Sequence, residues 1–147
     1  MAYTPSQQAQ LDVLNAAIAA VLNTSVPAHT MIKLAVAPFN PTPTSDPATF
    51  VEATFDGYAA KTISAWEAAY LNGNAAVSNG TTVESWVPTG TTTPNTVAGY
   101  WLVGGNGSYL GGEAFASPIA VTGPTTPVNI VPRYAVIPPV FSATLIP

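Results

Sequence analysis

The chain has 147 residues and no cysteine, and it carries only three Lys or Arg and seven Asp or Glu side chains, for a formal net charge of −4. An ordinary soluble domain has about a quarter charged residues, so this chain has few groups for acid–base catalysis, too few cations for a phosphate-binding surface and no thiolate for a disulfide or zinc site. A weakly charged surface can lie against another protein without burying unpaired ions, which favours a component of an assembly over an enzyme.

Residues 4–22 are predicted to form an amphipathic helix. Thr4 begins a Thr-x-x-Gln capping box that Gln7 completes, with Pro5 at the first helical position. Apolar residues recur at helical spacing on one face, and the opposite face is rich in alanine. The helix can therefore pack on its own domain or against a neighbouring subunit, and both alternatives stay open. Three residues of the apolar face are candidate partner-binding residues: Leu11, Leu14 and Ile18.

The first half of the remaining chain reads as short strands and loops. Alternation over residues 30–38 predicts a strand with Ile32, Leu34 and Val36 on one face. Residues 39–45 contain prolines and predict an extended loop, and Asp46-Pro47 predicts a short helical turn through Glu52.

The alternation resumes further along the chain. Residues 58–66 predict a strand with Tyr58, Ala60, Thr62, Ser64 and Trp66 on one side; residues 71–80 predict a polar loop, and residues 82–87 a strand. Residues 97–103, a glycine-rich turn and residues 108–115 together predict a β-hairpin. Segments 119–122 and 127–137 are predicted to supply the last strands, with Pro132 indicating an edge or a bulge.

This succession predicts a mainly β fold: an antiparallel β-sandwich or small barrel with an N-terminal amphipathic helix and an extended C-terminal tail. The predicted organisation is an N-terminal helix and linker at 1–29, a β-domain at 30–135, and a Pro-rich apolar C-terminal arm at 136–147. No apolar run approaches the roughly 20 residues of a membrane span.

The C-terminal arm has no charged side chain and contains three prolines. It is unsuited to a helix or a central strand. In water its large apolar side chains would form an exposed strip. The arm can fold back over its own domain, or it can lie along a neighbouring subunit as an edge strand or in a groove. Its candidate partner-binding residues are Val140, Phe141, Leu145 and Ile146.

Residue types that carry chemistry are scarce. His29 is the only histidine, so any Ser-His-Asp arrangement would depend on it. A calcium site at Asp46, Glu52 and Asp56 is conceivable but lacks EF-hand spacing. The Gly105-x-Gly107 sequence indicates a hairpin turn, because no third glycine or following helix completes a phosphate loop. We therefore expect no catalytic residue, cofactor or metal.

The aromatic residues occupy strand positions, where core packing is the default. Tyr100 and Trp101 are adjacent, so in a regular strand they point to opposite faces. We therefore expect one of them to face outward and to contact a partner or ligand.

A set of short motifs stands out in the β-rich part of the chain. The first are Ile32-Lys33-Leu34-Ala35-Val36, the Pro/Thr loop at 40–44, the Phe50-Val51-Glu52-Ala53-Thr54-Phe55-Asp56-Gly57-Tyr58 segment and Trp66. They are followed by Val97-Ala98-Gly99-Tyr100-Trp101-Leu102-Val103, a glycine turn, Glu113-Ala114-Phe115 and Pro118. Together these segments resemble a small structural protein of tailed bacteriophages. The resemblance covers about residues 30–135 and consists of a similar texture and short motifs; the helix and the arm are outside it.

The resemblance implies a non-enzymatic virion protein, most directly a decoration or cement protein of the phage head, made in the host cytoplasm. Its implied partners are the major capsid protein and further copies of itself, with a trimer favoured, and neither nucleic acid nor a membrane. The alternatives are a receptor- or carbohydrate-binding module of a tail or fibre, or a minor tail component. Decoration predicts that outward aromatic residues and the arm lie at protein contacts, whereas a glycan binder predicts an open aromatic shelf with polar neighbours.

Overall fold

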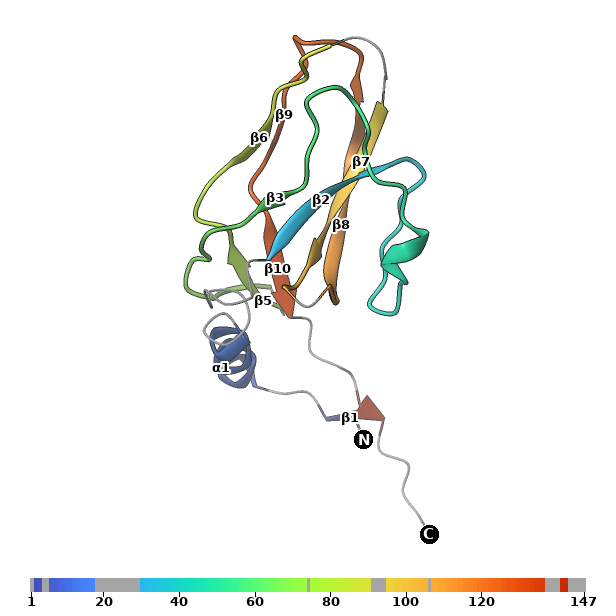
Figure 1. Ribbon diagram of the computed structural model, residues 1–147. Helices are drawn as coiled ribbons and strands as arrows, with labels where there is room; N and C mark the ends of the chain where they lie inside the picture. The colour runs from blue at the N-terminus through green and yellow to red at the C-terminus, as the bar shows by residue number, and fades with distance from the viewer. Residues whose placement is uncertain are drawn as a thin grey trace.

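The computed structural model describes residues 2–3, 6–17, 30–73, 75–90, 95–105, 107–136 and 141–142 (Figure 1). One α-helix precedes a body of antiparallel strands in the described chain, which confirms the predicted mainly β fold with an N-terminal helix. In chain order the elements are β1 (Ala2–Tyr3), α1 (Gln7–Ala17), β2 (Met31–Val36), the 3₁₀ turn η2 (Pro47–Thr49), β3 (Lys61–Thr62), β4 (Tyr70–Asn72), β5 (Ala75–Asn79), β6 (Glu84–Trp86), β7 (Asn95–Val103), β8 (Tyr109–Val121), β9 (Val128–Ile130), β10 (Arg133–Val136) and β11 (Phe141–Ser142).

Helix α1 packs on its own domain. Its N-terminus is capped by Ser6, whose Oγ accepts a hydrogen bond from the backbone N–H of Ala9 at 3.1 Å. The helix contacts β5, and also β4 and β10, at the lower end of the body in Figure 1. Leu14 is completely buried in this contact. The predicted cap at Thr4 and the predicted last turn at 18–22 lie outside the described residues.

The largest sheet has four strands in the order β3-β2-β7-β8. Its centre is β2, where Ile32 and Leu34 are fully buried as the alternation predicted. The predicted hairpin forms its other half, with Tyr100 opposite Glu113 across the β7–β8 ladder. The strand expected separately at 119–122 is the end of β8, because the pairing continues to Asn95–Val121 past an irregularity near Val97.

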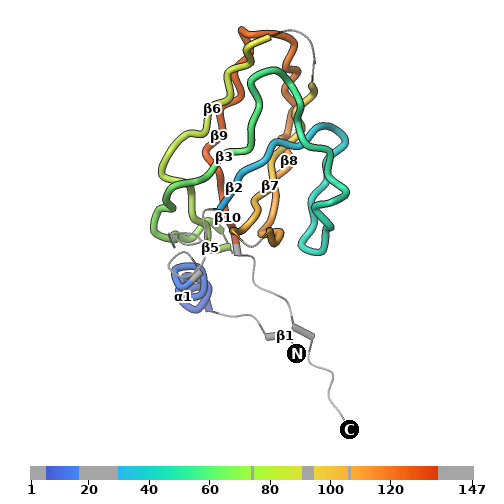
Figure 2. Tube along the Cα trace, viewed as in Figure 1, coloured from blue at the N-terminus to red at the C-terminus, as the bar shows by residue number. Residues whose placement is uncertain are grey.

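A second, interrupted ribbon runs alongside this sheet (Figure 2). In it β6 pairs with β9 and β5 pairs with β10. The segment that carries β5 and β6 therefore runs antiparallel to the segment that carries β9 and β10. The ladder breaks at Pro132, and its register shifts between the Glu84–Ile130 and Asn79–Arg133 pairs. Proline cannot donate to a ladder, so the predicted bulge or edge at Pro132 is confirmed.

Two predictions for the middle of the chain were wrong. Residues 71–80 form most of a β4–β5 hairpin, in which Ala76, Val77 and Ser78 are buried. The small residues looked like a loop, but they suit a strand on which α1 lies closely. In segment 58–66 only residues 61–62 are a strand, and the alternation is reversed at its centre: Ile63 is buried and Thr62 is exposed.

A single core joins these parts. It receives Leu14 from α1, Leu34 from β2, Tyr100 from β7, Trp86 from β6 and Ile130 from β9. The core therefore lies between the four-stranded sheet and the interrupted ribbon, an arrangement compatible with the predicted sandwich or barrel. The indole N–H of Trp86 donates to the carbonyl oxygen of Ala59 at 2.7 Å, so this buried polar group is paired.

Candidate functional site

The prediction that Tyr100 or Trp101 faces outward was wrong. The two side chains do point to opposite faces of the sheet, but they are only 2% and 3% exposed. Tyr100 enters the core, with its ring 6.3 Å from that of Phe115. Trp101 is covered by the loop and turn at 39–50, where its ring lies 5.5 Å from Phe50 and 6.3 Å from Phe39. Neither side chain is available to a partner.

Two glycines let the covering loop lie close to the hairpin. A Cβ added at Gly99 would come within 2.6 Å of the Phe39 ring, and one at Gly112 within 3.1 Å of Pro41. Phe39 and Phe50 of the loop thereby form a second small aromatic cluster with Trp101 and Tyr109. The ring centres of Phe50 and Tyr109 are 5.7 Å apart. This cluster turns what would be the outer face of the sheet into an interior.

Tyr100 anchors a polar cluster that connects β7, β8 and β10. Its hydroxyl donates to Glu113 Oε2 at 2.9 Å and accepts from the backbone N–H of Arg133 at 2.8 Å. The second carboxylate oxygen of Glu113 pairs with Arg133 Nη2 at 2.8 Å. Burial, and then the Glu113 charge, raise the pKa of Tyr100 far above its usual value. The cluster links two sheets that share no ladder among the described strands.

A second cluster, at strand β2, also combines a tyrosine, a glutamate and a cation. The Tyr58 hydroxyl donates to Glu52 Oε1 at 2.8 Å and accepts from the backbone N–H of Leu34 at 3.1 Å. Glu52 Oε2 pairs with Lys33 Nζ at 2.9 Å. Burial is the main cause that raises the pKa of Tyr58, and the hydrogen bond and charge of Glu52 add to it.

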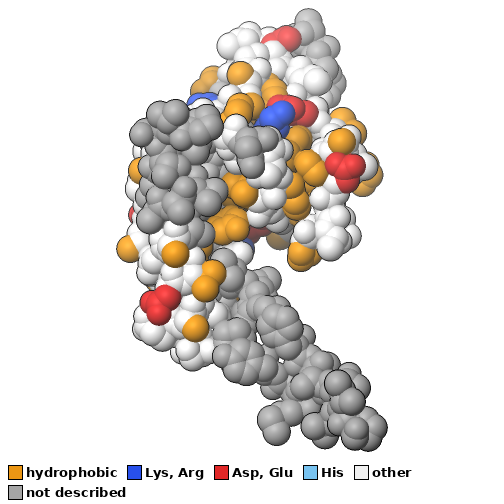
Figure 3. Space-filling model, turned by 60° about the horizontal axis from the view of Figure 1, so that its bottom comes forward, with side chains coloured by type: hydrophobic (Ala, Val, Ile, Leu, Met, Phe, Trp, Pro, Cys, Tyr) orange, Lys and Arg blue, Asp and Glu red, His pale blue; other side chains and the backbone are white. Residues whose placement is uncertain are grey.

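All three cations of the chain have partners within it. Lys33 and Arg133 form the ion pairs just described, and Lys61 Nζ lies 5.4 Å from the centre of the Trp86 ring. Charged side chains are few on the face in Figure 3, where polar and apolar atoms predominate and separate carboxylates are visible. A surface of this kind suits contact with another uncharged surface.

The helical candidates do not form an external site. Leu14 is fully buried against its own domain and Leu11 is partly buried against the same core, so the proposed docking face of the helix is turned inward. Ile18 lies outside the described residues. In the arm, β11 pairs with β1 through Tyr3–Phe141 and Ala2–Ser142. The other arm candidates, Val140, Leu145 and Ile146, lie outside the described residues.

Two of the three acidic side chains considered for a calcium site have structural roles. Asp46 Oδ1 accepts from the backbone N–H of Ala48 at 2.9 Å and caps η2, as the sequence predicted. Glu52 belongs to the Tyr58 cluster. Within the described ranges, no three His, Cys, Asp or Glu side chains gather as a metal ion requires. His29 lies outside those ranges.

The first surface that sequence reasoning missed is the outer side of the β6–β9 ribbon. Trp86, Val128 and Ile130 point inward and are buried, so the alternate residues point out. The outward residues include Val83, Val87 and Val131, which are 59%, 58% and 48% exposed. We call these three residues the valine face. The signal was present as Val83-Glu84-Ser85-Trp86-Val87: with Trp86 inside, both valines must be outside.

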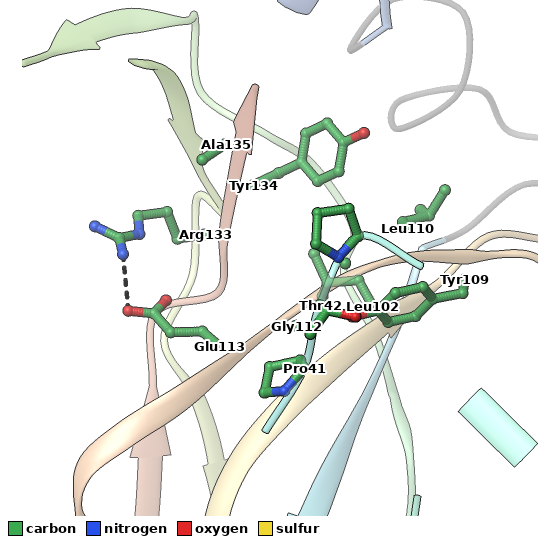
Figure 4. A pocket seen from close by; sticks show the side chains of 12 residues that line it. Pro41, Thr42, Leu102, Tyr109, Leu110, Gly112, Glu113, Arg133, Tyr134 and Ala135 are labelled. Carbon is green, nitrogen blue, oxygen red and sulfur yellow. Dashed lines mark hydrogen bonds and ion pairs between the residues drawn. The ribbon is translucent and has the colours of Figure 1, made fainter. Parts of the chain in front are cut away.

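The second missed feature is a cleft of about 510 Å³ between the loop at 41–43, the start of β8 and strand β10. Figure 4 shows Pro41 and Tyr109 on one side, Tyr134 on the other, and the Glu113–Arg133 ion pair at one end. Burial raises the pKa of Tyr109 and of Tyr134. The two walls come from residues far apart in the sequence, so no local pattern could reveal the cleft.

No helix in the described part of the chain combines the length and apolar character that a membrane crossing needs. Comparisons with protein-family models, with curated proteins and with solved structures gave no significant match.

Proposed function

We propose that this chain is a non-enzymatic structural protein of a phage virion, most directly a decoration or cement protein that binds the head lattice. The observation that carries the proposal is the distribution of charge. The few cations are engaged within the domain, and the surface presents hydroxyl, amide and small apolar groups. Such a surface can be buried against capsid subunits with few charges to compensate.

The valine face is the docking surface that fits this function best. It is apolar, it lies on a paired ribbon, and Ser85 and Asn129 are paired across its centre to supply hydrogen-bonding groups. Specific protein interfaces likewise combine uncharged apolar contacts with hydrogen-bonding groups. The resemblance to phage structural proteins points to the same class of partner.

The alternative, a carbohydrate-binding module, is less well supported. A glycan site of that kind needs exposed rings beside convergent polar groups. Tyr100 and Trp101, the rings that would have formed it, are buried in two separate aromatic clusters.

The proposal predicts that the chain is a stoichiometric component of purified particles and binds heads that lack it. Changing Val83→Asp and Val131→Asp together is expected to weaken binding by at least about tenfold, because it places charge in an interface core. The domain should fold normally, since exposed substitutions change stability by about 0.5 kcal/mol or less. Binding is measured by co-sedimentation with particles, and folding by circular dichroism.

Val51→Asp is the matched control. Val51 is 60% exposed, close to the 59% of Val83, but it follows η2, on the other side of the body from β6 and β9 in Figure 1. Val51→Asp should leave binding to particles unchanged. In addition, binding of the unaltered chain should weaken less than about threefold when salt is raised from about 0.05 to 0.5 M, a range over which exposed charges become strongly screened. Equal loss in both variants would refute the valine face, and absence of the chain from particles would refute the function.

A further inference from the structure

The cleft separates two edge strands. Among the described strands, β8 pairs only with β7, and β10 pairs only with β5, so each is the outermost strand of its sheet. Residues 109–113 of β8 and 133–135 of β10 face each other across the cleft. Edge strands present backbone donors and acceptors that attract another strand. An extended segment inserted here would lie beside both.

The polar groups at this edge support such an insertion. The N–H of Arg133 points away from β5 to the Tyr100 hydroxyl, which therefore occupies the place of a neighbouring strand at that residue. Because backbone groups alternate in direction along a strand, those of Ala135, two residues on, point to the same side. The ion pair of Glu113 with Arg133 is neutral overall and closes one end. The cleft thus favours an uncharged, extended occupant.

The chain itself contains a segment of that description. Residues 140–146 read Val-Phe-Ser-Ala-Thr-Leu-Ile, without charge, glycine or proline, and Pro139 and Pro147 bound them. Seven extended residues span about 23 Å at ~3.3 Å each. Their alternation places Phe141, Ala143 and Leu145 on one face, an apolar row for Pro41, Tyr109 and Leu110 of the cleft wall. Phe141–Ser142 already has strand conformation as β11.

The prolines favour the cleft of another copy over the chain's own cleft. To enter its own cleft beside β10, the arm would have to reverse direction at Ile137-Pro138-Pro139-Val140. Proline fixes φ near −65°, so Pro139 at the third position disfavours a type I turn, and types II, I′ and II′ need a positive φ at one or both central positions. The remaining class, type VI, would need a cis peptide bond before Pro139, which is the minor form of an X–Pro bond. The two-residue pairing of β11 with β1 is too short to retain the arm by itself.

We propose that residues 140–146 of one copy insert as a strand between β8 and β10 of a second copy. Each copy then donates one arm and receives one, in a reciprocal dimer or around a closed ring, which includes the predicted trimer. The inserted strand joins the two sheets across the cleft. This arm exchange goes beyond the proposed function and does not depend on it, because it concerns purified chains without any particle.

Disulfide trapping tests the exchange cleanly, because the chain has no cysteine. One preparation carries Thr42→Cys at the cleft, and a second carries Ser142→Cys or Ala143→Cys in the arm. Mixing them under mild oxidation is expected to give a covalent heterodimer on non-reducing gels, at least about fivefold above the yield with Thr125→Cys as the cleft partner. Thr42 and Thr125 are both exposed, but Thr125 is not among the cleft residues.

Several results would overturn the proposal. The double variant Thr42→Cys/Ala143→Cys could form only an internal disulfide and remain monomeric, which would place the arm in its own cleft. Equal heterodimer yields with Thr42→Cys and Thr125→Cys would mean that the disulfide forms by random collision of the chains. A measurement on the unaltered chain avoids any folding defect: raising the concentration from about 0.1 to 100 µM should slow amide hydrogen exchange together at 109–113, 133–135 and 140–146. Unchanged exchange at these residues, or protection elsewhere only, would also refute the exchange.

Discussion

Replacing Trp101 with alanine is expected to lower the free energy of unfolding by about 3–5 kcal/mol. Trp101 is 3% exposed, and its ring packs on Phe50 and Phe39 with Lys33 Nζ 5.9 Å from its centre. Its removal leaves a large cavity under the loop at 39–50. Since a domain is stable by only about 5–15 kcal/mol, the change is a large part of the total. Urea denaturation followed by circular dichroism measures it.

Tyr70→Ala is the matched control for this prediction. Tyr70 is also aromatic and on a strand, but it is 42% exposed, so its loss should cost far less than the loss of Trp101. Trp101→Phe should recover much of the lost stability, because a smaller ring still fills part of the site. If Trp101→Ala folded with normal stability but no longer bound particles, Trp101 would be a docking residue after all.

The second large effect is a loss of stability at alkaline pH that depends on Tyr100. Burial and the Glu113 charge raise the pKa of this tyrosine in the folded chain above its ordinary value of 10.0. The stabilisation is therefore complete below about pH 10, where both states are protonated, and decreases above it, where only the unfolded chain ionises. One such tyrosine makes the free energy of unfolding decrease with a slope that approaches about 1.4 kcal/mol per pH unit.

The Tyr100→Phe variant separates the contribution of Tyr100 to the alkaline loss of stability from the contributions of the other tyrosines. At pH 7 it should destabilise by about 1–3 kcal/mol, because the Arg133 N–H and a Glu113 oxygen lose their partner. Above pH 10 its stability should decrease less steeply than that of the unaltered chain. Phe115→Leu, beside the same ring, is the control: it lowers stability without changing the slope. Parallel slopes for the unaltered chain and Tyr100→Phe would contradict the buried cluster.

Local patterns were sufficient for elements whose neighbours along the chain determine them. The Asp46-Pro47 cap, the β7–β8 hairpin with its glycine turn and the interruption at Pro132 depend on backbone rules that act within a few residues. The buried face of β2 follows from a period of two, and the inward face of α1 from a period near four. These patterns determined the mainly β class with its N-terminal helix.

Other features depend on segments that meet only in the folded chain. Periodicity places Tyr100 and Trp101 on opposite faces, but it cannot say that the loop at 39–50 returns to cover the second face. The β4–β5 hairpin contains small residues, and its burial follows from the approach of α1.

The candidate surfaces belong to this second group. The valine face could be inferred from alternation once Trp86 was known to lie inside, but the pairing of β6 with β9 brings Val131 to it. The cleft has walls separated by about 20 to 90 residues of sequence, and it exists because β8 and β10 end two different sheets. Side-chain period is a property of one segment, whereas a covered face or an open edge is a property of two segments, and only the tertiary structure decides which two meet.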